Sequence, residues 1–236
     1  QISLRYFIDL SYNGRAYHGW QIQPDVTTVQ AELNHALSTV LRIPLECMGA
    51  GRTDTGVHAK QMVAHFDVDT KIDTKDLIYK LNVLLPKDIH INGIHEVHPE
   101  IHARFEALSR TYVYKVSRTK NAFKYQSEHT YTLPLDVDLM NQAAKILFEY
   151  TDFQCFSKVK TDVKTYDCTI MEAQWQVDNN SLNFTIKADR FLRNMVRAIV
   201  GTMIEVGAKK RTLEEFRKII ASKNRSNAGT SAPAHG

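Results

Sequence analysis

Residues 2–10 read ISLRYFIDL, and this stretch decides the fold class of the first half of the chain. Apolar side chains at every second position are typical of a strand with one buried face. That face is expected to carry Ile2, Leu4, Tyr6, Ile8 and Leu10. The other face carries Arg5, Phe7 and Asp9 and is more polar. The first predicted element is therefore a half-buried strand.

Helical and strand patterns alternate after this strand. Apolar residues at helical spacing predict a helix over 28–41, with Thr28 as its N-cap. A second helix follows, capped by Thr74 and stopped by Pro86. Further strands are predicted over 45–50, 61–68 and 89–97, the last bulged near Gly93. The order β-α-β-β-α-β is that of a ferredoxin-like unit.

The second half repeats a similar order of elements. Strands are predicted over 110–117 and 129–133, helices over 136–150, 191–206 and 212–221, and a hairpin of 165–177 with 182–188. We therefore expect an α+β protein of two ferredoxin-like subdomains, 1–104 and 105–236. Their mostly antiparallel sheets are expected to join side by side, with helices on one face and a basic cleft on the other.

Composition narrows the class of protein. The 236 residues are 43% hydrophobic and 24% charged, as in an ordinary globular protein. No apolar run is long enough for a membrane span, and no leader is visible. The three cysteines are odd in number and not closely paired, so they are expected to be buried and reduced, and a cytoplasmic protein is expected. The cysteines and histidines lack zinc-type spacing, so no metal site is predicted. A net charge of +4 and basic loops near 118–124, 158–164 and 209–211 favour a polyanionic partner.

The loop 49–59, GAGRTDTGVHA, is the most unusual stretch. Its glycines permit positive φ and a close approach to a ligand. Arg52 lies two residues before Asp54, and a shared cleft would keep that carboxylate ionised. An ionised carboxylate can act as a nucleophile or stabilise a developing cation. The alternative is a structural turn with a surface ion pair.

Two arginines in the second half of the chain can be interpreted in two ways. Arg193 and Arg197 are four residues apart and would share one face at the start of a helix, with an anion between them. The alternative is a solvated charged face. Tyr112, on a predicted strand, is expected to pack half-buried, and Tyr114 is expected in the core.

Gly51-Arg52-Thr53-Asp54-Thr55-Gly56-Val57-His58-Ala59 closely resembles the signature loop of the tRNA pseudouridine synthase A family. Further segments resemble other motifs of that family: 12–14 with 17–21, 28–32, 105–107, 110–114, 191–201 and 228–234. The resemblance runs from about residue 4 to the end. It also implies a closing strand beyond Gly236.

This resemblance implies that uridines 38, 39 and 40 of the tRNA anticodon stem-loop are isomerised to pseudouridine by a homodimer, without cofactor or metal. Asp54 is then the nucleophile or ribose-side stabiliser, Arg52 helps hold the base out of its stack, and Arg193 is a basic partner of Asp54. Tyr112 matches the family's active-site tyrosine, so its ring is expected to stack on the base and its hydroxyl can also transfer a proton. The alternative for Tyr112 is half-buried packing on its strand. Thr53, His58 and Arg197 are predicted substrate contacts, although His58 also suits a structural role.

Two rival functions remain at this point. Asp54-Thr55-Gly56 is the catalytic tripeptide of aspartic proteases, and a dimer would supply the second carboxylate. Such proteases need an all-β pattern, which the chain lacks. A non-catalytic RNA-binding protein would show the same basic loops, but it has no need of a carboxylate that repels phosphate.

Overall fold

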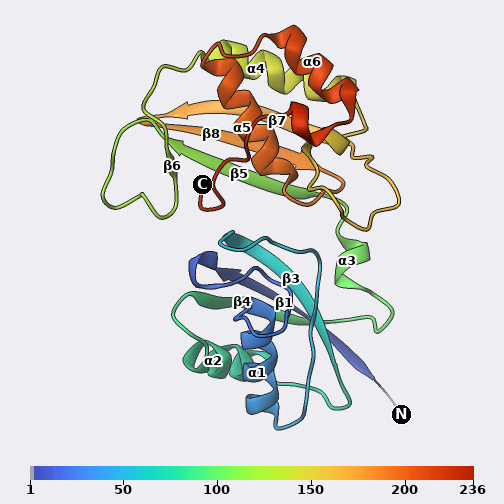
Figure 1. The fold of residues 1–236 in the computed structure, drawn as a ribbon. Coiled ribbons are helices and arrows are strands. Elements are labelled where there is room, and N and C mark those ends of the chain that lie inside the picture. The colour runs from blue at the N-terminus through green and yellow to red at the C-terminus, as the bar shows by residue number, and fades with distance from the viewer. Residues whose placement is uncertain (1–2) are drawn as a thin grey trace. The chain divides into compact units, whose positions relative to one another are not determined.

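The computed structural model describes residues 3–236, and the chain divides after Leu108 into two compact units. Unit 1 comprises the residues up to Leu108, and unit 2 comprises Ser109–Gly236. Each unit has its own sheet of four strands together with its own helices (Figure 1). Each unit also has its own apolar core. The predicted α+β class is therefore confirmed.

The sheet of unit 1 has the strand order of a ferredoxin-like fold. Its strands are β1 (Leu4–Tyr12), β2 (Met48–Gly49), β3 (Ala59–Val68) and β4 (Ile89–Val97). They lie in the order β2-β3-β1-β4, and every neighbouring pair is antiparallel. Tyr6, Ile8 and Leu10 are buried as the alternation predicts, whereas Ile2 lies outside the described residues.

Local irregularities of this sheet agree with the sequence in one place and differ in another. The pairing of β1 with β4 shifts register between Asp9 and Leu10, opposite Gly93 and Ile91, so the predicted bulge is confirmed. By contrast, β2 is much shorter than the strand predicted over 45–50. Its pairing with β3 is confined to Met48 and Gly49.

Two helices of unit 1, α1 (Val29–Leu41) and α2 (Thr74–Leu84), cover one face of its sheet (Figure 1). The short α3 (Ala103–Glu106) follows β4, and a 3-10 turn, η1 (Gly14–Ala16), follows β1. The Thr28 side chain accepts the Ala31 N–H, which confirms that cap. The predicted Thr74 cap is wrong by one residue, because the carboxylate of Asp73 accepts the Asp76 N–H instead.

The sheet of unit 2 consists of β5 (Arg110–Ser117), β6 (His129–Thr130), β7 (Ile170–Asp178) and β8 (Ser181–Ala188). The order is β6-β5-β8-β7, with β6 parallel to β5 and the other pairs antiparallel. β7 and β8 form the predicted hairpin, although β7 begins at Ile170 and not at Thr165. Asn179 turns it with φ of 52°, a conformation that asparagine tolerates.

Three α-helices pack in unit 2: α4 (Val137–Ile146), α5 (Met195–Gly207) and α6 (Leu213–Ser222). The 3-10 turns are η2 (Leu147–Glu149), η3 (Gln154–Phe156) and η4 (Arg225–Asn227). Thr212 and Glu215 form the predicted capping box of α6. Most of α5 is buried, and its apolar side chains form much of the core of unit 2.

The three cysteines belong to these cores. Cys47, Cys155 and Cys168 are buried and unpaired with one another, as expected from their number and spacing. Burial raises the pKa of Cys47 to about 12 and that of Cys168 to about 11, so neither thiol is a ready nucleophile.

Within residues 3–236, no helix combines the length and the apolar character needed to cross a membrane.

Candidate active site

The Asp54 loop of unit 1 is held by the segment that follows β1. On the N-terminal side of Asp54, the Trp20 N–H donates to the Thr53 carbonyl at 3.3 Å, and the Tyr12 hydroxyl shares a 2.8 Å hydrogen bond with Thr53 Oγ1. On the other side, the Gly56 N–H donates to the Tyr17 carbonyl at 3.2 Å. The backbone on both sides of the carboxylate is thereby fixed.

Two glycines allow this close approach. A Cβ on Gly14 would lie 1.9 Å from the Val57 carbonyl oxygen, and a Cβ on Gly19 would lie 2.3 Å from that of Thr53. Gly19 also has φ of 79°, which side chains with a Cβ rarely adopt. The opening segment therefore needs glycine at both positions in order to contact the loop.

His58 forms a further contact between the Asp54 loop and the segment that follows β1. Its Nδ1 accepts the backbone N–H of Gly14 at 3.0 Å. An accepting Nδ1 carries no proton, so the neutral ring holds its proton on Nε2. This contact gives His58 a defined structural role in the loop, one of the two roles that the sequence leaves open.

The loop itself turns tightly around Asp54. The Val57 N–H donates to the Asp54 carbonyl at 3.1 Å, and Gly56 within this turn has φ of 82°. Thr53 and Asp54 are half-buried, whereas Arg52 is exposed. The structure records no ion pair for Arg52 among residues 3–236. Its guanidinium is therefore accessible to a ligand.

In unit 2, Tyr112 and Tyr114 lie on the same face of β5 but in different surroundings. Tyr112 is half-buried and packs edge-on against Phe191, with ring centroids 5.0 Å apart. Tyr114 is buried, and its hydroxyl donates to the Pro233 carbonyl at 2.7 Å. Burial raises the pKa of Tyr114, and the Arg197 cation opposes part of the shift. The expectation that Tyr114 belongs to the core is confirmed.

The predicted helix over 191–206 begins too early. Asn194 adopts a left-handed conformation with φ of 67°, and α5 starts only at Met195. Arg193 is therefore outside the helix, and the premise that Arg193 and Arg197 share one helical face is wrong. The physical reason is local, because asparagine enters the left-handed region more readily than other residues with a Cβ. Arg193 is exposed, and Arg197 is half-buried on the first turn.

The C-terminal segment 228–236 packs against α5 much as the opening segment packs against the Asp54 loop. Arg197 Nε donates to the Ala232 carbonyl at 2.8 Å, and the Ala232 N–H donates back to the Arg197 carbonyl at 2.9 Å. A Cβ on Gly201 would lie 1.8 Å from the Thr230 carbonyl oxygen. In each unit, two motifs that are distant in sequence therefore contact each other: segment 12–21 and the Asp54 loop in unit 1, and segment 228–236 and α5 in unit 2.

The structure places Arg52, Thr53, Asp54 and His58 on one loop of unit 1, and Tyr112, Arg193 and Arg197 on unit 2. Sequence patterns assigned no role to Tyr12, Gly14 or Trp20, which hold the Asp54 loop. The two glycines in 12–21 were the feature of the sequence that could have indicated this role. The contacts themselves join segments far apart in sequence, and a local pattern cannot show such contacts. Within residues 3–236, no group of three or more His, Cys, Asp or Glu side chains is placed to hold a metal ion.

Comparison with known proteins identifies the family. The sequence profile of the tRNA pseudouridine synthase family matches residues 10–106 and 143–236. Tyr112 lies between these ranges. Similar proteins named tRNA pseudouridine synthase A include those of Bacteroides thetaiotaomicron and Parabacteroides distasonis. Each is 53% identical over 98% of this chain, which aligns with 87% and 92% of their respective lengths.

A more distant relative shows the same coverage. The tRNA pseudouridine synthase A of Bacillus licheniformis is 38% identical over 96% of this chain and 94% of its own length. Similarity over nearly the full length of both proteins extends to both units and to both paired sets of motifs. The chain therefore belongs to the tRNA pseudouridine synthase family, a family of isomerases that convert uridine in tRNA to pseudouridine.

Proposed function

We propose that this protein isomerises uridines 38, 39 and 40 of the tRNA anticodon stem-loop, with the Asp54 carboxylate as the catalytic group. The observation that carries the proposal is the fixed backbone around Asp54, held through Thr53, Gly56 and His58. A catalytic group must be held in a productive geometry. A structural turn on the surface would not require two glycines in an opposing segment.

The chemistry suits one ionised carboxylate. The C–N glycosidic bond breaks, the base turns, and carbon C5 of the base bonds to the ribose. C5 then loses its proton and N1 takes up one, so the product is an isomer of the substrate. The carboxylate either attacks the ribose carbon or stabilises the positive charge that develops there. The reaction is redox-neutral and adds no atom to the product, so the proposal requires no cofactor and no metal.

The other predicted residues have roles that fit this reaction. Arg52 is exposed and can hold the everted base and its phosphates. Tyr112 presents a ring for stacking on uracil and a hydroxyl that can transfer a proton. Arg193 and Arg197 supply positive charge for the carboxylate or for phosphate. Thr53 contacts the substrate through its backbone or hydroxyl. His58 acts as a positioning residue through its bond to Gly14.

Asp54→Asn tests the proposal because it removes the charge and keeps the shape. We expect the variant to bind tRNA with wild-type affinity but to release no tritium from tRNA labelled at C5 of uridine. The matched control is Asp69→Asn, an exposed carboxylate of the same unit, which should retain full turnover. Turnover by Asp54→Asn would exclude Asp54 as the catalytic group. Loss of pseudouridine at positions 38–40 in cells lacking the protein would establish the target positions.

The rival functions predict other outcomes. A non-catalytic RNA-binding protein would release no tritium even as wild type. An aspartic protease needs two carboxylates and an all-β fold, whereas both units contain helices packed on sheets. The family match favours neither alternative.

We also propose that the protein acts as a homodimer in the cytoplasm, where its tRNA substrate is present. The family resemblance supports this assembly. Sedimentation equilibrium at the enzyme concentration used for the assay should give twice the chain mass of 27.0 kDa. Full activity at a concentration where the chain is monomeric would refute the dimer.

A further inference from the structure

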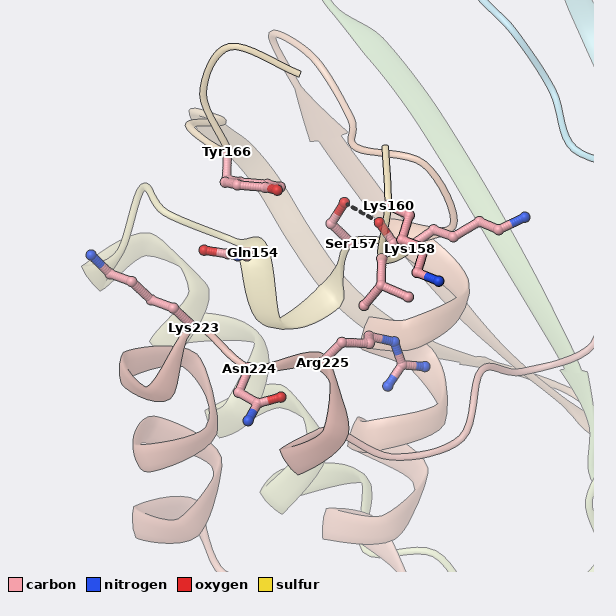
Figure 2. A pocket seen from close by; sticks show the side chains of 9 residues that line it. Gln154, Ser157, Lys158, Lys160, Tyr166, Lys223, Asn224 and Arg225 are labelled. Carbon is pink, nitrogen blue, oxygen red and sulfur yellow. Dashed lines mark hydrogen bonds between the residues drawn. The ribbon is translucent and has the colours of Figure 1, made fainter. Parts of the chain in front are cut away.

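A basic pocket lies in unit 2 between η3, the loop that follows it, and η4 (Figure 2). Its volume is about 380 Å³. Four cationic side chains line it, together with Gln154, Ser157, Val159, Tyr166 and Asn224. The cations are Lys158, Lys160, Lys223 and Arg225. No carboxylate belongs to the lining within the part of the chain that the structure describes.

The positive charge of this pocket is largely uncompensated. Arg225 is half-buried and donates to the Gly229 carbonyl at 3.0 Å and to Ser231 Oγ at 2.9 Å, both neutral acceptors. Over residues 3–236, Lys223 is the lining cation with a recorded ion pair, to Asp152 at 3.7 Å. That pair is long and partly exposed, so it contributes little. A group of four cations with one weak carboxylate partner favours an anionic ligand.

Other basic loops of unit 2 differ from the pocket in this respect. Lys124 pairs with Glu128 at 3.7 Å, and Arg211 forms an ion pair with Glu205. Arg118 donates to the carbonyls of Tyr131 and Leu133, so it fixes its own loop. The lysines of the pocket are therefore better placed than these residues to bind an external anion.

The neutral side chains indicate what kind of anion would fit. Gln154 contributes a side-chain amide to the pocket lining, and Asn224 lines the pocket while its side-chain oxygen accepts the Ser226 N–H at 2.9 Å. Tyr166 adds an aromatic ring, which lies above Gln154 in Figure 2. Cations, amide donors and a ring together suit a phosphodiester with its attached nucleoside.

A backbone hydrogen bond connects the pocket to Arg193, a residue of the proposed active site. The backbone N–H of Lys158 donates to the Arg193 carbonyl at 2.9 Å. We propose that this pocket binds a backbone phosphate of the RNA substrate, at a nucleotide other than the everted uridine. The proposal rests on the proposed function for the identity of the RNA. A phosphate held here would position the RNA without taking part in the bond changes.

Lys158→Gln and Lys160→Gln test the pocket, because neither side chain has a recorded hydrogen bond or ion pair within residues 3–236. Each change should weaken tRNA binding by roughly three- to tenfold, near the net contribution of one solvent-accessible hydrogen bond. The slope of log K against log salt should fall by about 0.7–1 for each phosphate that the variant no longer neutralises. We expect KM to rise and kcat at saturating tRNA to stay near the wild-type value.

The matched control is Lys145→Gln, an exposed lysine of α4 that does not line the pocket. It should change tRNA binding by less than about twofold, because a distant surface charge is screened by salt. An equal loss of affinity in Lys145→Gln would show general attraction to RNA and overturn the pocket. Unchanged binding in both pocket variants would overturn it as well.

Two further measurements separate this proposal from others. If wild type binds tRNA but never releases tritium, the proposed function fails while the binding comparison still decides the pocket. Calorimetry with inorganic phosphate alone should show no tight binding. A micromolar dissociation constant that Lys158→Gln abolishes would assign the pocket to free phosphate and overturn its assignment to RNA.

Discussion

The backbone N–H of Gly14 donates to Nδ1 of His58 at 3.0 Å, and this bond joins two segments that are 44 residues apart in sequence. It lies beside the contact between Gly14 and the Val57 carbonyl. The position of Asp54 therefore depends on a glycine just after β1 as much as on its own loop. This dependence leads to the first two predictions.

Gly14→Ala should displace the Asp54 loop. The new methyl group would lie 1.9 Å from the Val57 carbonyl oxygen, so the backbone must move. A shift of about 1 Å at a catalytic group can cost roughly a hundredfold in rate. We expect tritium release to fall by roughly tenfold or more, and the thermal midpoint to fall as well. Gly93→Ala is the control, since its methyl group would meet nothing within 4 Å. Equal activities of the two variants would contradict this prediction.

His58 should be replaceable by a residue that keeps the acceptor. His58→Asn places an amide oxygen near the position of Nδ1, so kcat should stay within about threefold of wild type. His58→Leu leaves the Gly14 N–H without its acceptor, which costs about 1–3 kcal/mol when the group is buried. We expect kcat to fall roughly tenfold or more in the Leu variant. Steady-state kinetics on tRNA distinguishes the two. An equally large decrease in the Asn variant would point instead to direct contact between His58 and substrate.

Local patterns predicted most elements of the fold. Alternation located β1, helical spacing and Thr28 located α1, and the Thr212 capping box located α6. The errors occurred where neighbouring residues have similar propensities. Asp73 and Thr74 are both good N-caps, and the apolar run at 191–192 continues the helical pattern of α5 although Asn194 interrupts it.

The candidate site was predictable to a different extent. The sequence singled out the Asp54 loop because glycines, a cation and a carboxylate are concentrated there. It could not show that Tyr12 and Trp20 hold Thr53, since such contacts depend on how β1 and β3 pair. It also placed Arg193 on a helix that begins two residues later. Tertiary contacts and single-residue backbone conformations are the information that periodicity lacks.

Tyr112 and Tyr114 should separate catalysis from stability. Tyr114→Phe removes the hydrogen bond to the Pro233 carbonyl and should lower the free energy of unfolding by about 0.5–1.5 kcal/mol, with little change in kcat. Tyr112→Phe keeps the ring packed on Phe191 but removes the hydroxyl proposed to transfer a proton, so kcat should fall by roughly a hundredfold. Chemical denaturation and tritium release measure the two effects. A reversed pattern would assign the catalytic hydroxyl to Tyr114.

His65 should make unit 1 sensitive to acid. Burial, and then the charges of Arg5 and His102, lower the pKa of His65 from 6.5 to about 4, with Asp67 opposing. Its Nδ1 accepts the Ala103 N–H at 3.1 Å, as the neutral ring requires. The unfolded chain takes up the proton near pH 6.5, whereas the folded chain resists it. Stability is therefore intact above pH 6.5 and declines as the pH falls from 6.5 toward 4.

Comparing two histidine variants separates the effect of His65 on the pH dependence of stability from the effect of the carboxylates. His65→Asn retains an acceptor for the Ala103 N–H but does not titrate, so its thermal midpoint should fall less than that of wild type between pH 7 and pH 4.5. His35→Asn, at an exposed position of α1, should follow the wild-type curve. Because the two variants remove the same chemical group, a difference between them reports the surroundings of His65. Parallel curves for wild type and both variants would mean that protonation of His65 does not favour unfolding.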